Sequence, residues 1–149
     1  MANRAERIRL IKAMQERLNR ESRSDLLRFT LATMPTFRPA DFHRRYYQCL
    51  TKFATGEIKK LMVFMPPQHG KSEGSTRRLP AFLLGQDPDK RLAIVSYNAP
   101  KARKFNREIQ RIIDTPEYHA IFPETCLNAS NVTTIAGSWL RNADECEIV

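Results

Sequence analysis

The chain has 149 residues, 42% of them hydrophobic, and a formal net charge of +9 at pH 7. This length suits one domain with its own core, and the composition excludes a disordered chain. The positive surplus favours nucleic acid or another polyanion as partner. The three cysteines are not spaced as metal ligands, and their odd number argues against a disulfide framework. Neither a secretory signal nor a membrane-spanning run is evident, which favours the cytoplasm.

The N-terminal part is expected to be helical. Residues 3–21 carry an apolar stripe at three- and four-residue spacing, formed by Ile8, Ile11, Met14 and Leu18. Between Asn3 and Arg28 there are eight basic and four acidic residues. This surplus fits either a solvated helix face or a surface that contacts a polyanion.

Two further helices are expected before the first apolar run. The sequence Ser22-Arg23-Ser24-Asp25 is typical of a cap that starts a new helix, which Met34-Pro35 would end. A third helix is expected from about Pro39 to Gly56. Its apolar face consists of Phe42, Tyr46, Cys49, Leu50 and Phe53. Such a face usually belongs to the core, and an aromatic side chain on it is also able to contact a nucleotide base.

Strands and helices are expected to alternate in the middle of the chain. The short apolar runs 61–65 and 92–97 predict strands buried on both faces. A helix is expected over 71–84, with Pro80 kinking or restarting it, and turn residues follow at 85–89. Asn98 would cap another helix that Thr115-Pro116 closes, with an inward face of Phe105, Ile109, Ile112 and Ile113. Shorter strands are expected at 132–135 and 145–149.

This alternation predicts an α/β fold. The expected architecture is a partial parallel sheet of the P-loop NTPase type, flanked by helices and preceded by an α-helical N-terminal segment. Residues 1–56 would form the helical segment, and residues 57–149 an incomplete P-loop ATPase core within the same single domain.

The run LMVFMPPQHGKSEGSTRR at 61–78 resembles a phosphate-binding P-loop. Gly70, Lys71 and Ser72 stand where that motif has its final Gly-Lys-Ser, whereas Met65 replaces its first glycine. Pro66-Pro67 would turn the chain off the strand instead.

The chemistry of a P-loop assigns roles to these residues. Backbone amides from Gln68 through His69 and Gly70 to Ser72 would hold phosphates at a helix N-terminus. Lys71 would be the catalytic cation, and the Ser72 hydroxyl would bind Mg²⁺. The simpler alternative is a solvent-facing turn with an incidental lysine. A catalytic role for His69 would require a partner carboxylate that the local sequence does not provide.

Motifs in a fixed order extend the comparison over residues 35–125. They are Pro66-Pro67, His69-Gly70-Lys71-Ser72, Arg77-Arg78-Leu79-Pro80, Leu84-Gly85, Pro88-Asp89-Lys90-Arg91, Ser96-Tyr97, Tyr118 and Phe122-Pro123. This order resembles the start of the ATPase domain of phage terminase large subunits, the motors that package viral DNA. A missing first glycine in the loop is common in that family.

The resemblance implies a function for the whole protein. It would hydrolyse ATP with Mg²⁺ to drive double-stranded DNA into a procapsid, in the cytoplasm of a bacterial host. It would work as an oligomer on the portal protein, together with the small terminase subunit. No membrane association is implied.

Two departures from the family limit this expectation. Relatives usually have arginine at the position of Gln68, so sensing of the γ-phosphate there is in doubt. The apolar strand that ends in magnesium-binding acids, the catalytic glutamate and the nuclease domain are all missing. Asp144 and Glu145 precede an apolar end instead of following a strand. We therefore expect an N-terminal piece of a longer terminase that does not turn over ATP alone.

Two other functions fit the same sequence. The chain could be a non-enzymatic basic module that binds nucleic acid or a portal. It could also belong to another P-loop DNA motor, such as a helicase.

Overall fold

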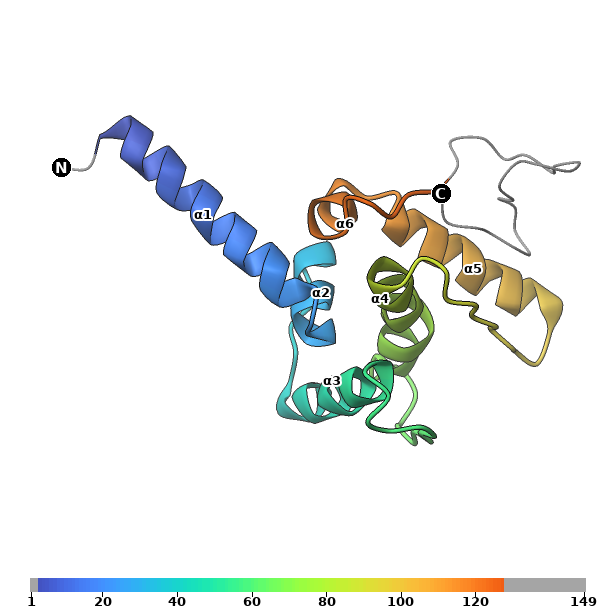
Figure 1. Cartoon of the computed structure of the whole chain (residues 1–149). Helices are drawn as coiled ribbons and strands as arrows, with labels where there is room; N and C mark the ends of the chain where they lie inside the picture. Colours follow the sequence, from blue (N-terminus) through green and yellow to red (C-terminus); the bar gives the residue numbers. More distant parts are fainter. Residues whose placement is uncertain (1–2, 128–149) are drawn as a thin grey trace, which may run out of the picture.

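Helices form the regular structure of the computed structural model, which describes residues 3–127 (Figure 1). In chain order they are α1 (Arg4–Ser22), α2 (Leu26–Thr33), α3 (Asp41–Ala54), η1 (Glu73–Arg78, a π-helical stretch), α4 (Leu79–Gln86), α5 (Ala99–Ile113) and α6 (Pro116–Ile121). The predicted strands at 132–135 and 145–149, together with Asp144 and Glu145, lie outside the described residues. Within residues 3–127, no helix has the length and hydropathy needed to cross a membrane.

The capping residues begin helices where the sequence predicts them. Asp25 accepts a hydrogen bond from the Arg28 amide at 2.8 Å at the start of α2. Asn98 accepts one from the Lys101 amide at 2.9 Å at the start of α5. Each bond satisfies an amide that lacks an acceptor in the first turn of a helix. The predictions of α1, α2, α3 and α5 are confirmed.

The predicted helix after the loop is also confirmed, with a different geometry around Pro80. The chain is helical from Lys71, widens through η1 and continues as α4, with Pro80 in the first turn of α4. Because proline has no N–H and crowds the preceding turn, a π-helical stretch just before it accommodates the ring. Gly85, predicted to begin a turn, instead lies inside α4.

The predicted parallel sheet is wrong for the described residues. Segments 61–65 and 92–97 are not strands, and neither makes a backbone hydrogen bond within residues 3–127. Instead of filling a two-sided sheet, segment 61–65 lies on the helical core through Leu61, Val63 and Met65. Its alternate side chains, Met62 and Phe64, are 78% and 84% exposed.

The second predicted strand follows the same pattern. Ile94 packs against the core, whereas Val95 and Tyr97 are largely exposed. A short apolar run fits both a two-sided strand and an extended segment that covers one face of a helical core. Only contacts with distant residues decide between them, and here helices supply those contacts.

Aromatic rings form the centre of the core. Phe29 of α2, Phe82 of α4, and Tyr118 and Phe122 at α6 are neighbours, with ring centroids 5.4 to 6.2 Å apart. A side chain at Gly85 would place its Cβ 2.3 Å from Phe122, so only glycine allows α4 to approach this ring. The core thus joins the N-terminal helices to the helices that follow the loop.

Helix α1 projects from this assembly (Figure 1). Only its C-terminal end meets the body: Asn19 donates a hydrogen bond to the Ala120 carbonyl at 3.1 Å, beside α2 and α6. Its predicted apolar stripe is therefore exposed, with Ile11 and Met14 65% and 58% accessible.

Candidate functional site

A cleft lies at the turn that leads into η1. Its volume is about 320 Å³, at the small end of the range for ligand pockets. The lining residues are Met65, Pro66, Pro67, Gln68, His69, Gly70, Lys71, Ser72, Glu73 and Arg77. The structure therefore brings the five predicted loop residues, 68–72, together around one cleft.

Most carbonyls of this loop accept hydrogen bonds, whereas its amides do not donate any within the described residues. Gln68 and Gly70 have φ angles of +62° and +76°, and His69 between them has a negative φ. Alternation of this kind makes successive amides converge into a concavity that binds anions. Within residues 3–127, the amides of 68–72 donate no hydrogen bond, whereas the carbonyls of Pro67, His69 and Gly70 each accept one and that of Lys71 accepts two.

Helix α3 holds the carbonyl side of the loop. The Tyr46 hydroxyl donates to the Lys71 carbonyl at 2.7 Å. The His43 ring accepts a hydrogen bond at Nδ1 from the Ala40 amide at 3.0 Å, so its proton lies on Nε2. That Nε2–H donates to the His69 carbonyl at 3.2 Å. The α3 face that the sequence identified as core or base-binding thus also fixes the loop.

Two glycines allow this close approach. A Cβ at Gly70 would lie 3.2 Å from the His43 Nε2 atom, and the positive φ there already disfavours other residues. A Cβ at Gly74 would lie 2.7 Å from the Tyr46 ring. Glycine is therefore required at both positions for the helix start to rest on α3.

Arginines neutralise the carboxylates next to the cleft. Glu73 pairs with Arg77 at 2.9 Å and with Arg78 at 2.7 Å. Arg77 also pairs with Glu108 of α5 at 2.6 Å, and this hydrogen bond raises the pKa of the Arg77 guanidinium. The buried Arg78 donates further to the Thr33 hydroxyl at 2.8 Å.

Lys71 differs from these arginines. Its side chain is exposed and forms no salt bridge within the described residues. The two arginines and two glutamates cancel in charge, so Lys71 leaves the cleft with a net positive charge. An anion is the ligand that this charge and the unbonded amides favour.

A catalytic role for His69 would require a partner carboxylate, and acidic side chains near the cleft would also help to bind Mg²⁺. Glu73 is the single acid among the residues that line the cleft, and two arginines hold it. His69 donates from Nδ1 to the Pro67 carbonyl at 2.7 Å, and no hydrogen bond joins it to a carboxylate in the described residues. Residues 3–127 also contain no cluster of three His, Cys, Asp or Glu side chains able to hold a metal ion.

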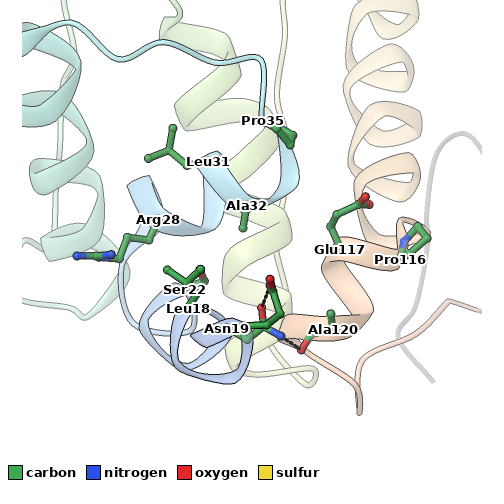
Figure 2. A pocket seen from close by; sticks show the side chains of 11 residues that line it. Leu18, Asn19, Ser22, Arg28, Leu31, Ala32, Pro35, Pro116, Glu117 and Ala120 are labelled. Carbon is green, nitrogen blue, oxygen red and sulfur yellow. Dashed lines mark hydrogen bonds between the residues drawn. The ribbon is translucent and has the colours of Figure 1, made fainter. Parts of the chain in front are cut away.

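A second pocket, of about 580 Å³, lies between α1, α2 and α6 (Figure 2). Leu18 and Asn19 of α1, Leu31 and Ala32 of α2, and Ala120 of α6 are among the residues that line it. None of the predicted site residues lines this pocket, and no sequence motif indicated it.

Comparison with known proteins identifies no family for this chain. No protein-family model, curated protein or solved structure matches the chain.

Proposed function

We propose that the loop of residues 65–73 binds the phosphates of ATP. One observation carries this proposal: five consecutive amides, 68–72, have no acceptor within residues 3–127, while the carbonyls of Pro67, His69, Gly70 and Lys71 are bonded. Unbonded backbone donors cost free energy unless water or a ligand accepts from them. At the start of a helix, the helix dipole adds to their attraction for an anion.

Lys71 and Ser72 complete the phosphate site. Lys71 supplies a charge that no carboxylate of the described residues neutralises, and we assign it to the β- and γ-phosphates. Bound Mg²⁺ would neutralise further charge on the phosphates, and Ser72 is the residue of the loop that would contact it. Gln68 would contribute its backbone N–H, since its side chain carries no charge to attract the phosphates.

The wider proposal is that the chain is the N-terminal part of the ATPase of a phage terminase large subunit. The whole protein would power packaging of double-stranded DNA in the cytoplasm of a bacterial host, with the portal protein and the small terminase subunit as partners. The order of the sequence motifs and the loop geometry support this proposal. The parallel sheet expected for such an ATPase core is absent from the described residues, so the proposal rests on the motif order and the loop alone.

Binding and hydrolysis are separate expectations for this chain. Hydrolysis needs a water molecule aligned by a free base or polar group. Glu73 is engaged by two arginines and is not available for that role. We therefore expect residues 1–149 to bind ATP without appreciable turnover.

The test is a titration of the chain with a fluorescent ATP analogue. Lys71→Ala removes a charge-assisted contact, so we expect the Kd to rise about 5- to 150-fold, equivalent to about 1–3 kcal/mol. Lys12→Ala is the matched control, because Lys12 is an exposed lysine on α1 and its loss changes the net charge equally. Equal effects of the two variants, or no binding by the unaltered chain, would contradict the proposal.

A further inference from the structure

The solvent-exposed face of α5 carries a row of positive charges. Arg103, Arg107 and Arg111 are all exposed and follow one another at four-residue spacing, with the exposed Lys104 beside them. A helix rises 1.5 Å per residue, so successive arginines lie about 6 Å apart along one slanting side.

The opposite side of α5 fixes the orientation of this row. Phe105, Ile109, Ile112 and Ile113 are buried in the core, so the helix cannot turn its basic side inward. Glu108, the acid within α5, pairs with Arg77 at 2.6 Å and with Lys104 at 3.9 Å. Within residues 3–127, no salt bridge joins Arg107 or Arg111 to an acid, so these two exposed arginines keep the outward face positive.

We propose that this face of α5 binds the phosphate backbone of duplex DNA. Arginine matches phosphate geometry with two parallel donors, and a regular row of arginines fits a polymer that repeats its charge. A membrane surface fits less well, since a membrane-bound helix buries apolar side chains in lipid and those of α5 are already in the core. The choice of duplex DNA rests on the proposed packaging function; the site itself is separate from the ATP loop.

The test compares two variants that lose the same charge. Arg107→Gln/Arg111→Gln removes two members of the row, and Arg9→Gln/Arg20→Gln removes two exposed arginines of α1. Binding of a labelled duplex of mixed sequence is measured by fluorescence anisotropy over a series of salt concentrations. We expect the α5 variant to bind at least about tenfold more weakly, and its slope of log K against log salt to flatten by about 1.8, or 0.9 for each lost phosphate contact. The α1 variant should stay within about twofold of the unaltered chain.

Three outcomes would overturn the proposal. Equal weakening by both variants would show that net charge alone attracts DNA, and no effect of the α5 variant would place the contact elsewhere. Binding to vesicles containing phosphatidylserine that exceeds duplex binding, and is lost in the α5 variant, would identify a membrane site instead. The ATP titration distinguishes this failure from that of the loop: the α5 variant should bind ATP normally, and Lys71→Ala should retain most of its affinity for DNA.

Discussion

Two adjacent tyrosines of α3 have different roles. The Tyr46 hydroxyl donates to the Lys71 carbonyl and so holds the loop, and burial raises the pKa of Tyr46. The buried Tyr47 hydroxyl has no hydrogen-bond partner in the described residues. Burial raises the pKa of Tyr47 to about 12. The same residue type thus serves the loop at one position and the core at the next.

Substitution by phenylalanine should therefore affect the two tyrosines differently. Tyr46→Phe removes a hydrogen bond, so the free energy of unfolding should fall by about 1 kcal/mol, and ATP should bind more weakly because the loop loses a support. Tyr47→Phe removes a hydroxyl without a partner and should leave stability unchanged or slightly higher. Urea denaturation and the ATP titration measure both effects. Similar losses in the two variants would show that Tyr46 does not position the loop.

At the scale of elements, helices with strong local signals could be predicted from the sequence. Asp25 and Asn98 bond to amides three residues away, and the apolar spacing of α5 extends over its whole length. Helix α6 was missed because six residues are too few for periodicity to show. The extended segments were assigned as strands because an apolar run does not specify what covers it.

Helix α1 shows that periodicity does not establish burial. Its stripe has helical spacing like that of α5, yet Ile11 is 65% exposed whereas Ile109 is 2% exposed. Ile11→Gln should therefore change the free energy of unfolding by less than about 0.5 kcal/mol. The same substitution at Ile109 places an amide in the core and should cost about 3 kcal/mol or more. Urea denaturation of the two variants provides the comparison, and a large loss at Ile11 would mean that α1 packs against the body in solution.

For the whole molecule, one core connects helices that are distant in the sequence. Tyr118 of α6 is fully buried among the aromatic rings, and its hydroxyl donates to the Ala81 carbonyl of α4 at 3.0 Å. Burial raises the pKa of Tyr118 well above its ordinary value. The ionised form is thus excluded from the folded state, which makes global stability sensitive to alkaline pH.

The direction of this sensitivity follows from proton binding. A tyrosine in the unfolded chain titrates near pH 10, while folded Tyr118 keeps its proton to higher pH. Its contribution to stability is complete below about pH 10 and is lost as pH rises further, at up to about 1.4 kcal/mol per pH unit. We expect the free energy of unfolding to fall above pH 10, and to fall less steeply in Tyr118→Phe. Urea denaturation at pH 9 to 11.5 measures both slopes, and identical slopes would contradict this account.

Part of the candidate site, the loop of residues 66–72, could be predicted from the sequence. The prolines, glycine, lysine and serine of residues 66–72 predicted a phosphate-binding turn at the start of a helix, because turn geometry and helix initiation depend on neighbouring residues. The structure places these residues around one cleft. The support from His43 and Tyr46, and the neutralisation of Glu73, could not be predicted, since no local pattern specifies them.

Local signals specify where the longer helices begin and end and where the turn before η1 lies, because caps, periodicity and prolines act within a few residues. Long-range contacts, in contrast, set the apolar segments 61–65 and 92–97 against helices, with no sheet within residues 3–127. Such contacts also place α3 against the loop and leave the arginines of α5 facing solvent. These features depend on contacts between residues far apart in the chain, and the free energy of such contacts is not encoded in any short stretch of sequence.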